Sequence, residues 1–426
     1  MRYQKLKGMV DILPGESEHW QYLEAIAQQV FSNYQYHEIR TPILEQYDVF
    51  ARSSGDSSDI VSKEMYDFED KGHRHVALRP EGTAGVVRAF VENKLFGPDQ
   101  THPYKVWYKG PMFRYERPQS GRQRQFHQIG VEALGSDRPE LDVETIVMAC
   151  DFLKKLGLVD YKIVINTLGD QPTRKAYHEA LISYLTPLKA ELSADSQERL
   201  EKNPLRILDS KDEHDQELVA NAPSILDYLT SAAQDHFQQV QQLLKALDID
   251  YQIDSNMVRG LDYYNHTIFE IMLTSPAFGN KEMTLIAGGR YNGLVEELGG
   301  PQVAGVGFGM GVERLLLVLE QQQNSLPTLS RPDIYLVAVD EQTSLAVSKL
   351  LAQLRWQGIS AERDYLGKKV KAQFKQADRL QARFTLTIGE QELEQQQAQL
   401  KRMQDGQQTT VDLSNLADLI AKIKKG

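Results

Sequence analysis

Residues 113–132 read FRYERPQSGRQRQFHQIGVE, and this stretch is the starting point for interpreting the whole chain. Its pattern predicts two strands joined by a basic loop, because turn-forming and arginine residues gather in the middle, at Arg117, Pro118, Ser120, Gly121, Arg122 and Arg124. Side chains alternate along a strand, so one face of the first strand holds Arg114 and Glu116, and one face of the return strand holds Phe126, Gln128, Gly130 and Glu132. If these faces coincide, cations, carboxylates and an aromatic ring line one floor.

Such a floor has the chemistry to hold a nucleotide beside a small amino compound. Guanidinium groups suit the oxygens of a polyphosphate, a flat ring stacks on a base, and a carboxylate binds an amine or an imidazole N–H. A polar hairpin with a solvated, charged turn is the alternative interpretation of an arginine-rich loop. Other stretches of the chain must decide between the two.

Four further stretches carry possible chemistry: IRTPILE at 39–45, LRPEGT at 78–83, VRGLDYY at 258–264 and GVGFGMGVERL at 305–315. The alternating glycines of the last stretch do not satisfy G-x-G-x-x-G, so a dinucleotide-binding interpretation fails. In a strand they would let a ligand lie on the backbone, and a helix that begins near Val312 would bring Arg314 towards it. Glu81 and Thr83 also fit the start of a helix at Ala84–Val91.

Together these stretches resemble the class II aminoacyl-tRNA synthetases. Residues 113–132 match motif 2 in its Phe113-Arg114-x-Glu116 form. Residues 39–45 are similar to motif 1 around Pro42, residues 78–83 to the substrate-binding turn that follows it, and residues 305–315 to motif 3. The stretch Val258–Tyr264 is the signature that singles out the bacterial-type histidyl-tRNA synthetase family. The resemblance extends from GMVDILPGE at 8–16 into the last hundred residues.

The resemblance implies a role for each matching residue. Around ATP, it implies that Arg114 and Arg259 are catalytic and hold the α-phosphate, that Arg122 and Arg314 reach the outer phosphates, and that Glu116 and Phe126 hold and stack the adenine. Around histidine, it implies that Glu81, Thr83 and Gln128 hold the amino group, and that Glu132, Tyr263 and Tyr264 form the imidazole pocket. Mg²⁺ is expected to accompany ATP, with Arg259 a cation where other class II enzymes rely more on magnesium. No metal ion is expected on protein ligands.

The implied activity is histidine–tRNA ligation. L-Histidine attacks the α-phosphate of ATP to give histidyl-adenylate and pyrophosphate, and the terminal ribose of tRNA(His) then takes the histidyl group. Positioning and charge stabilisation would carry the rate. The rival is a non-catalytic paralogue, the histidine-binding regulatory subunit of ATP phosphoribosyltransferase. Such subunits tend to lose the phosphate-holding arginines and the C-terminal domain, and this sequence has both.

The chain is expected to be an α/β protein with an α+β catalytic body. Residues 1–325 would form the class II catalytic domain, an antiparallel sheet with flanking helices, interrupted at about 171–254 by a helical insertion. After Pro327 and Pro332, a β-α-β-α-β order predicts a small, largely parallel domain at 331–426, which resembles the anticodon-binding domain of the family. A strand at Ile39–Glu45 containing Pro42 would lie at an edge, and the resemblance implies that it builds the contact of a homodimer.

Composition limits the class of protein further. The net charge of −11 is unusual for a protein that binds RNA, but the segment between Arg363 and Arg383 holds seven Lys and Arg and only two Asp and Glu. Such a local patch can steer a phosphate backbone. Cys150 is the only cysteine, which excludes an internal disulfide and a cysteine cluster for zinc. Neither a signal peptide nor an 18-residue apolar stretch is visible, so we expect a cytoplasmic protein without a membrane span.

Some local features are also predicted from the sequence. Ser17–Tyr34 is expected to be an amphipathic helix, and His73 and His75 to lie at a solvated hairpin tip instead of a metal site. The acidic stretch Asp209–Asp215 reads as a surface loop. Tyr263 and Tyr264 are expected to point to opposite faces if they belong to a strand that continues through 267–271.

Overall fold

The alternating residues of the return strand lie at the centre of an eight-stranded sheet. Strand β6 (Gln125–Leu134) pairs antiparallel with β5 (Tyr104–Phe113) on one side and with β11 (Gly305–Gly311) on the other. Ile129, Val131 and Ala133 are buried in the largest hydrophobic core. The even-numbered side chains therefore point to the opposite face of the sheet.

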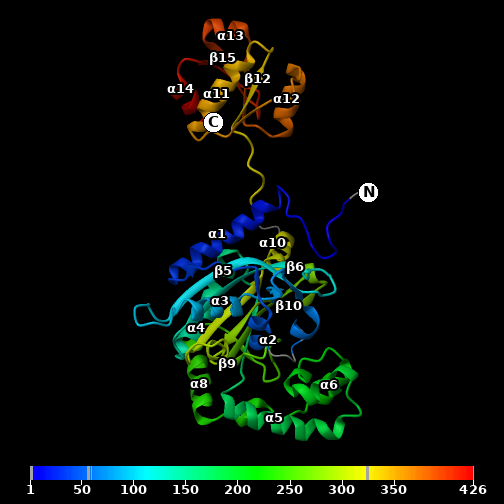
Figure 1. Cartoon of the computed structure of the whole chain (residues 1–426). Coiled ribbons are helices and arrows are strands. Elements are labelled where there is room, and N and C mark those ends of the chain that lie inside the picture. The colour runs from blue at the N-terminus through cyan, green and yellow to red at the C-terminus, as the bar shows by residue number, and fades with distance from the viewer. Residues whose placement is uncertain (1–2, 55–57, 59, 323–325, 426) are drawn as a thin grey trace. The chain divides into compact units, whose positions relative to one another are not determined.

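The computed structural model describes residues 3–54, 58, 60–322 and 326–425. The chain divides into two compact units, Met1–Pro327 and Thr328–Gly426 (Figure 1). The expected domain limits at residues 1, 325 and 426 lie outside the described residues. No helix within the described ranges is long and apolar enough to cross a lipid bilayer.

The large sheet of the first unit has the order β1-β5-β6-β11-β10-β9-β7-β8. The remaining strands are β1 (His37–Glu38), β7 (Lys162–Thr167), β8 (Gln252–Ile253), β9 (Asn265–Ser275) and β10 (Lys281–Arg290). All pairs from β5 to β7 are antiparallel, and a short parallel strand is added at each edge, β1 beside β5 and β8 beside β7. The expected antiparallel sheet is confirmed, with these two edge strands as an addition.

Helices bury their apolar stripes against the core face of this sheet. Helix α1 (Ser17–Asn33), the blue helix of Figure 1, buries Leu23, Ala27, Val30 and Phe31, which recur at helical spacing as expected. Helix α4 (Pro139–Lys155) begins with a proline and has acidic side chains in its first turn, both of which favour a helix start. Helix α10 (Val312–Gln321) follows β11 directly and adds Val312, Leu315 and Leu319 to the core.

A three-stranded sheet lies beside the large one, with the order β2-β4-β3. Its strands are β2 (Leu44–Gln46), β3 (Tyr66–Glu69) and β4 (His75–Leu78), and the helical elements next to it are α2 (Tyr47–Ser54), a π-helix at Ile60–Glu64, α3 (Thr83–Glu92) and α9 (Leu294–Glu297). His73 lies at the tip of the β3–β4 hairpin with its side chain 90% exposed, as expected.

The expected strand at Ile39–Glu45 is wrong for most of its length, because β1 ends at residue 38 and β2 begins at residue 44. Pro42 has no N–H to donate to a strand ladder. Arg79 binds the free backbone instead: its Nη1 donates to the carbonyl of Thr41 (3.1 Å) and its backbone N–H to the carbonyl of Ile43 (2.9 Å).

Arg114 and Glu116 are not strand residues either, because β5 ends at Phe113. One further bond crosses the hairpin, from the N–H of Arg114 to the carbonyl of Arg124 (2.9 Å). Beyond it the loop bonds to other segments: the N–H of Tyr115 donates to the carbonyl of Glu64 (2.6 Å), and that of Arg124 to the carbonyl of Gly8 (2.8 Å). The basic hairpin loop is therefore held from two sides by segments that are distant in the sequence.

Residues 171–254 are mainly helical, but they do not form a separate body. The helices are α5 (Gln171–Leu185), α6 (Ala194–Lys202), α7 (Glu213–Val219) and α8 (Ser231–Ala246), with 3₁₀ turns at Thr186–Leu188, Pro204–Ile207 and Ile225–Tyr228. Phe237, Val240 and Leu244 of α8 belong to the core of the large sheet, and β8 is one of its strands. We call residues 171–230 the insertion.

The acidic stretch of the insertion is not a simple surface loop. Asp215 is completely buried, and its carboxylate accepts hydrogen bonds from the hydroxyls of Ser193 (2.6 Å), Ser196 (2.5 Å) and Ser210 (2.6 Å). Three donors compensate the burial of a charge that water would otherwise solvate. Among the acidic residues of this stretch, the expectation of a surface loop is wrong for Asp215 alone, because Asp209, Asp212 and Glu213 are exposed.

The expectation for the tyrosine pair is also wrong. Residues 254–264 have no regular structure, and β9 begins only at Asn265. Tyr263 and Tyr264 are both buried, with ring centroids 4.6 Å apart, so the rings lie next to each other instead of on opposite faces.

The second unit is the expected small α/β domain with its own core. Strands β12 (Ile334–Ala338), β13 (Ala361–Arg363) and β14 (Phe384–Ile388) are parallel, and α11 (Ser344–Trp356) and α12 (Val370–Arg379) connect them. The chain continues into α13 (Glu390–Gln395), the antiparallel strands β15 (Gln397–Arg402) and β16 (Gln408–Asp412), and α14 (Leu416–Lys425). The last two strands are a feature that the sequence analysis missed.

Candidate active site

A cavity of about 500 Å³ lies over the face of β6 that is turned away from the core. Ten of the twelve residues singled out from the sequence line it: Glu81, Arg114, Glu116, Arg122, Phe126, Gln128, Arg259, Tyr263, Tyr264 and Arg314. The other two, Thr83 and Glu132, are buried next to it. The structure thus brings together residues from four separate stretches of the chain.

Glu132 is surrounded by hydroxyl groups. Its Oε1 accepts hydrogen bonds from Thr83 (2.7 Å) and Tyr108 (3.3 Å), and its Oε2 accepts one from Tyr291 (2.5 Å). Burial raises the pKa of Glu132 to about 8, although the three hydroxyls act in the opposite direction. In its ionised form a carboxylate has about four acceptor positions, so these three donors leave one position on Oε2 when Glu132 is ionised.

Two of the alternating glycines serve protein side chains instead of a ligand. A Cβ atom at Gly307 would lie 2.0 Å from Oε2 of Glu132, and one at Gly305 would lie 2.3 Å from the ring of Tyr291. Gly309 and Gly311 line the cavity, as expected for glycines next to a ligand. We expected all four glycines to make room for a ligand. This is wrong for Gly305 and Gly307, because the side chains of Tyr291 and Glu132 occupy the space next to them.

Glu81 lies at the first turn of α3, where its two carboxylate oxygens accept the backbone N–H groups of Thr83 (2.7 Å) and Ala84 (2.8 Å). The side chain is buried, and burial raises the pKa of Glu81 against the effect of these two hydrogen bonds. The expected helix start is confirmed. The same carboxylate faces the cavity, where it can accept a hydrogen bond from a ligand ammonium.

Arg259 is held in the cavity wall by one acidic partner. Its guanidinium pairs with Glu270 of β9 and lies 5.6 Å from the ring centroid of Tyr264. The second oxygen of Glu270 accepts the hydroxyl of Thr284 (2.6 Å). The buried Nε of Arg259 has no partner within the described residues. An unpaired buried donor is unfavourable, so a ligand oxygen at this point would gain a strong hydrogen bond.

The aromatic ring and the cations of the loop lie side by side. Nε of Arg114 donates to the carbonyl of Pro80 (2.9 Å), and its Cζ lies 5.1 Å from the ring centroid of Phe126. Glu116 accepts a hydrogen bond from Arg122 (3.2 Å). A flat base and its phosphates could therefore be bound next to each other.

Arg314 connects α10 with the basic loop. Its Nε donates to the carbonyl of Gly121 (3.2 Å) and its Nη1 to the carbonyl of Thr284 (2.9 Å). Burial and the neighbouring cation Arg122 lower the pKa of Arg314. Two like charges held close together are typical of a site that binds an anion.

Comparison with known proteins decides the family. The family model of histidyl-tRNA synthetase matches residues 8–315, and that of the anticodon binding domain matches residues 333–423. The chain belongs to the histidyl-tRNA synthetase family. It is 63% identical to the histidine–tRNA ligase of Levilactobacillus brevis over 98% of this chain and 96% of the relative. It is 61% identical to that of Ligilactobacillus salivarius, with coverage of 100% and 99%. The solved structure of the apo histidyl-tRNA synthetase of S. aureus is 42% identical and covers 98% of this chain and 99% of its own, with a TM-score of 0.84.

Some residues of this histidyl-tRNA synthetase site were missed from the sequence. Tyr108 and Tyr291 position Glu132, and neither belongs to a motif that we recognised. Glu270 pairs with Arg259 and could have been found, because it is the only charged residue in the otherwise uncharged strand NHTIFEIMLTS. A lone carboxylate on a buried strand requires a partner.

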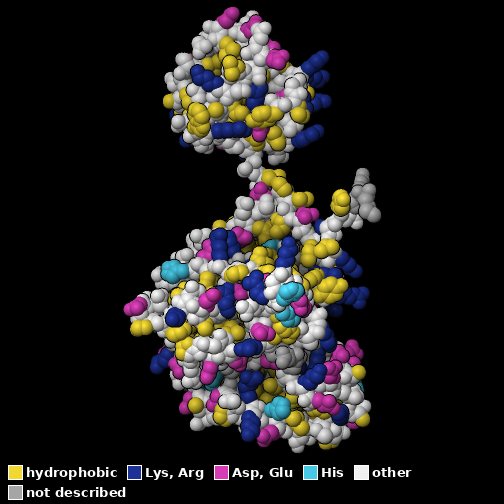
Figure 2. Space-filling view, in the orientation of Figure 1, with side chains coloured by type: hydrophobic (Ala, Val, Ile, Leu, Met, Phe, Trp, Pro, Cys, Tyr) yellow, Lys and Arg dark blue, Asp and Glu magenta, His cyan; other side chains and the backbone are white. Residues whose placement is uncertain are grey.

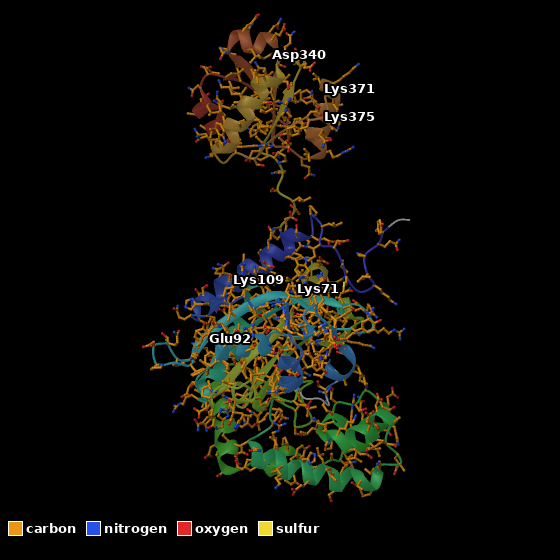
Figure 3. The ribbon with its side chains drawn as sticks, viewed as in Figure 1. Lys71, Glu92, Lys109, Asp340, Lys371 and Lys375 are labelled. Atoms are coloured by element: carbon orange, nitrogen blue, oxygen red, sulfur yellow. The ribbon has the colours of Figure 1, made fainter. Side chains whose placement is uncertain are left out.

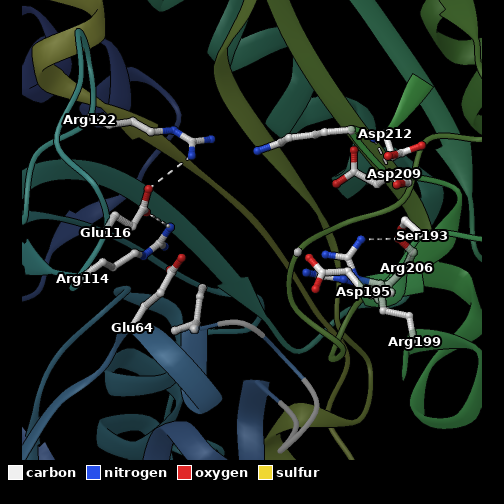
Figure 4. A pocket seen from close by; sticks show the side chains of 15 residues that line it. Glu64, Arg114, Glu116, Arg122, Ser193, Asp195, Arg199, Arg206, Asp209 and Asp212 are labelled. Atoms are coloured by element: carbon white, nitrogen blue, oxygen red, sulfur yellow. Dashed lines mark hydrogen bonds and ion pairs between the residues drawn. The ribbon is translucent and has the colours of Figure 1, made fainter. Parts of the chain in front are cut away.

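A second cavity of about 580 Å³ adjoins the first and shares Arg114, Glu116 and Arg122 with it. Figure 4 shows these three side chains on one side of this cavity and Arg199 and Arg206 of the insertion on the other. No group of three or more His, Cys, Asp or Glu side chains placed to bind a metal ion occurs in the described part of this family member.

Proposed function

We propose that the first cavity carries out both half-reactions of histidine–tRNA ligation, the activity that family membership assigns to the chain. In the first, a carboxylate oxygen of histidine bonds to the α-phosphorus of ATP, and pyrophosphate leaves. In the second, a ribose hydroxyl at the 3′ end of tRNA(His) attacks the carbonyl carbon of histidyl-adenylate, and AMP leaves. The residues below position the reactants and stabilise the charge that develops.

The observation that carries the proposal is the unpaired Nε of Arg259 in the same cavity as Arg114. We assign both guanidinium groups to the α-phosphate. Negative charge builds up there in the transition state, and a fixed cation in a buried site stabilises it more than it stabilises the ground state. Arg122 and Arg314 are assigned to the outer phosphates, and Glu116 and Phe126 to the adenine.

Histidine is assigned to the other end of the cavity. Glu81, Thr83 and Gln128 would hold its amino group. The remaining acceptor position on Glu132 would take an imidazole N–H, with Tyr263 and Tyr264 completing the pocket. An amino acid without that N–H leaves the buried carboxyl one donor short, and an unmade buried hydrogen bond costs roughly 1–3 kcal/mol.

Magnesium is part of the proposal only as a companion of ATP. The carboxylates of Glu116 and Glu270 line the cavity, and one or two carboxylates with substrate phosphates are the usual environment of this ion. Bound there, Mg²⁺ would neutralise phosphate charge. Arg259 would stabilise the remaining negative charge on the α-phosphate directly, as a cation supplied by the protein.

The second unit is assigned to the anticodon of tRNA(His). Its basic helix α12 carries Lys371 and Lys375, which point away from the domain in Figure 3, and Figure 2 shows Lys and Arg side chains projecting from this edge. Phosphate contacts of this kind supply much of the affinity for RNA. We place the enzyme in the cytoplasm, where its tRNA substrate is used.

We also propose that the protein is a homodimer. One face of the three-stranded sheet carries Leu44 and Phe68, which are 42% and 48% exposed, with Tyr66 and Leu78 beside them. An apolar sheet face without cover favours association with another chain. Leu44 on this sheet face belongs to the segment that resembles motif 1, and in the family this segment forms the contact of a homodimer. We therefore propose that the partner is a second copy of this chain.

The regulatory-subunit alternative is not favoured, because the full-length relatives at 63% and 61% identity are histidine–tRNA ligases. ATP–pyrophosphate exchange measured with each of the twenty amino acids tests the proposal. We expect exchange with histidine alone. Histidine binding without any exchange would support the regulatory alternative.

A further inference from the structure

The loop that carries Arg259 lacks regular structure, so side chains from elsewhere must hold it. Residues 254–264 connect β8 with β9 and also carry both pocket tyrosines. At the start of the loop, Nδ2 of Asn166 on β7 donates to the carbonyls of Ser255 (3.2 Å) and Met257 (3.0 Å). These two bonds fix the loop to the large sheet before the chain reaches Arg259.

At and after Arg259, the support comes from the insertion. Nη1 of Arg206 donates to the carbonyl of Arg259 (3.1 Å). Nδ2 of Asn203 donates to a carboxylate oxygen of Asp262 (3.0 Å), and Nη2 of Arg174 to the carbonyl of the same residue (3.4 Å). The half of the loop that holds the catalytic arginine is thus attached to a different part of the fold from the first half.

Arg206 is itself firmly held. It lies on the 3₁₀ turn Pro204–Ile207, and its carbonyl accepts a hydrogen bond from Nη1 of Arg199 on α6 (3.3 Å). Helix α6 in turn is anchored by the buried carboxylate of Asp215, which binds the hydroxyls of Ser193 and Ser196 at the start of this helix. A support that is rigid itself can fix the position of what it binds.

We propose that Arg206 is a positioning residue for adenylate formation, which holds the backbone of Arg259 from the insertion so that its guanidinium points at the α-phosphate. The inference rests on the role proposed above for Arg259. Both Arg206 and Arg199 line the cavity of about 580 Å³ next to the active site (Figure 4). The insertion therefore contributes to the first half-reaction, before any tRNA is bound.

The size of the effect follows from geometry. If the backbone carbonyl of Arg259 loses its hydrogen bond from Arg206, the backbone and the guanidinium that it carries can move by about 1 Å, and a misplacement of this size can slow a reaction by about 100-fold. The effect acts through Arg259, so it should appear in the rate of adenylate formation more than in the Michaelis constant for histidine. If Arg206 only stabilised the fold, its loss would not change the rate of adenylate formation selectively over the Michaelis constant for histidine.

The test is a double-mutant cycle on the full-length enzyme without tRNA. Single-turnover formation of histidyl-adenylate is measured for wild type, Arg206→Met, Arg259→Ala and the double variant. Methionine keeps the apolar stem of Arg206 and removes its donors. We expect Arg206→Met to be 10- to 100-fold slower than wild type, and to slow the Arg259→Ala enzyme by no more than about twofold. Arg206→Lys, which keeps a charged donor, should recover part of the rate.

Lys202→Ala is the matched control. This side chain is also a cation of the insertion, but it is 60% exposed and pairs with Glu198 on the surface. It should leave the rate unchanged. If Arg206→Met does not melt cooperatively, Arg206→Gln replaces it in the same cycle, since its shorter side chain keeps a polar end but does not reach the carbonyl.

The outcomes separate this inference from the proposal on which it rests. Equal slowing by Arg206→Met in both backgrounds, or a normal rate in the wild-type background, overturns the positioning role while a slow Arg259→Ala enzyme keeps its own assignment. A normal rate for Arg259→Ala overturns the role of Arg259 and the inference with it.

Discussion

At the scale of single residues, Glu132 shows how the pocket controls a charge. Its pKa of about 8 is far above the ordinary value of 4.5, mainly because of burial. The folded chain therefore binds this proton more tightly than the unfolded chain does. The stabilisation is fully present below about pH 4.5 and is lost as the pH rises through about 8.

Replacement of Glu132 by Gln should remove this dependence. The free energy of unfolding of Glu132→Gln, measured with urea between pH 5 and 8 without ligands, is expected to fall less with rising pH than that of wild type. The exposed substitution Glu394→Gln serves as the control for a general change in charge. A variant that keeps the wild-type slope would show that Glu132 is not the group responsible.

The residues that line the cavity could be predicted from the sequence much better than the residues that hold them in place. Arg114 and Glu81 lie in stretches of consecutive residues that match family motifs, so they could be recognised from the sequence alone. Tyr108 belongs to β5 and Tyr291 directly follows β10, and they meet Glu132 only because those strands lie near it in the sheet. A single sequence does not state which strands are neighbours, so these contacts could not be derived.

At the scale of elements, the insertion depends on Asp215. Burial raises the pKa of this carboxyl, but the hydroxyls of Ser193, Ser196 and Ser210 outweigh that effect and lower it to about 2. For a carboxyl with a lowered pKa, the stabilisation is present above the unfolded value of about 4 and is lost as the pH falls towards 2. The pH dependence therefore has the opposite sign from that of Glu132.

We expect Asp215→Ala to destabilise the protein at pH 7 by roughly 1–3 kcal/mol, because it leaves buried hydroxyls without an acceptor. The difference from wild type should shrink as the pH is lowered towards 2. Urea unfolding at several pH values measures both effects, with Asp235→Ala on the exposed side of α8 as the control. A difference that does not change with pH would argue against an ionised Asp215.

The elements themselves were mostly predictable, and the exceptions have physical causes. Helix α1 follows from apolar spacing, whereas the strand expected at Ile39–Glu45 fails at Pro42. Strands β15 and β16 were missed because their sequences, QAQLKR and QTTVD, are largely polar. Strand β15 buries only Ala398 and Leu400 and β16 only Val411, so hydrophobic alternation gives a weak signal there.

Helix α12 allows a test of the RNA surface. Neutralising Lys371 and Lys375 together by substitution with Gln should weaken tRNA(His) binding and reduce the slope of log affinity against log salt by about two, because each phosphate contact contributes about one. Filter binding over a range of KCl concentrations measures the slope. Lys424→Gln with Lys425→Gln on α14 removes the same charge from another helix and is expected to have less effect.

At the scale of the whole molecule, the two units predict a separation of activities. Every residue assigned to ATP or histidine lies before Pro327, and each unit has its own hydrophobic core. A fragment that ends at residue 327 should therefore still exchange pyrophosphate in the presence of histidine, whereas its charging of tRNA should fall far more. Gel filtration and thermal melting establish first that the fragment is folded. Charging at the full-length rate would contradict the role of the second unit in holding tRNA.

Strand β6 has a consequence for how this enzyme can change over generations. The odd-numbered side chains of Ile129, Val131 and Ala133 fill the core, whereas the even-numbered side chains of Phe126 and Gln128 line the cavity and Glu132 is buried next to it. Loss or gain of one codon within Gln125–Leu134 would exchange the two sets at every later position, placing Glu132 in the core and an apolar residue in the pocket. Length variation among descendants should therefore be eliminated within the strand.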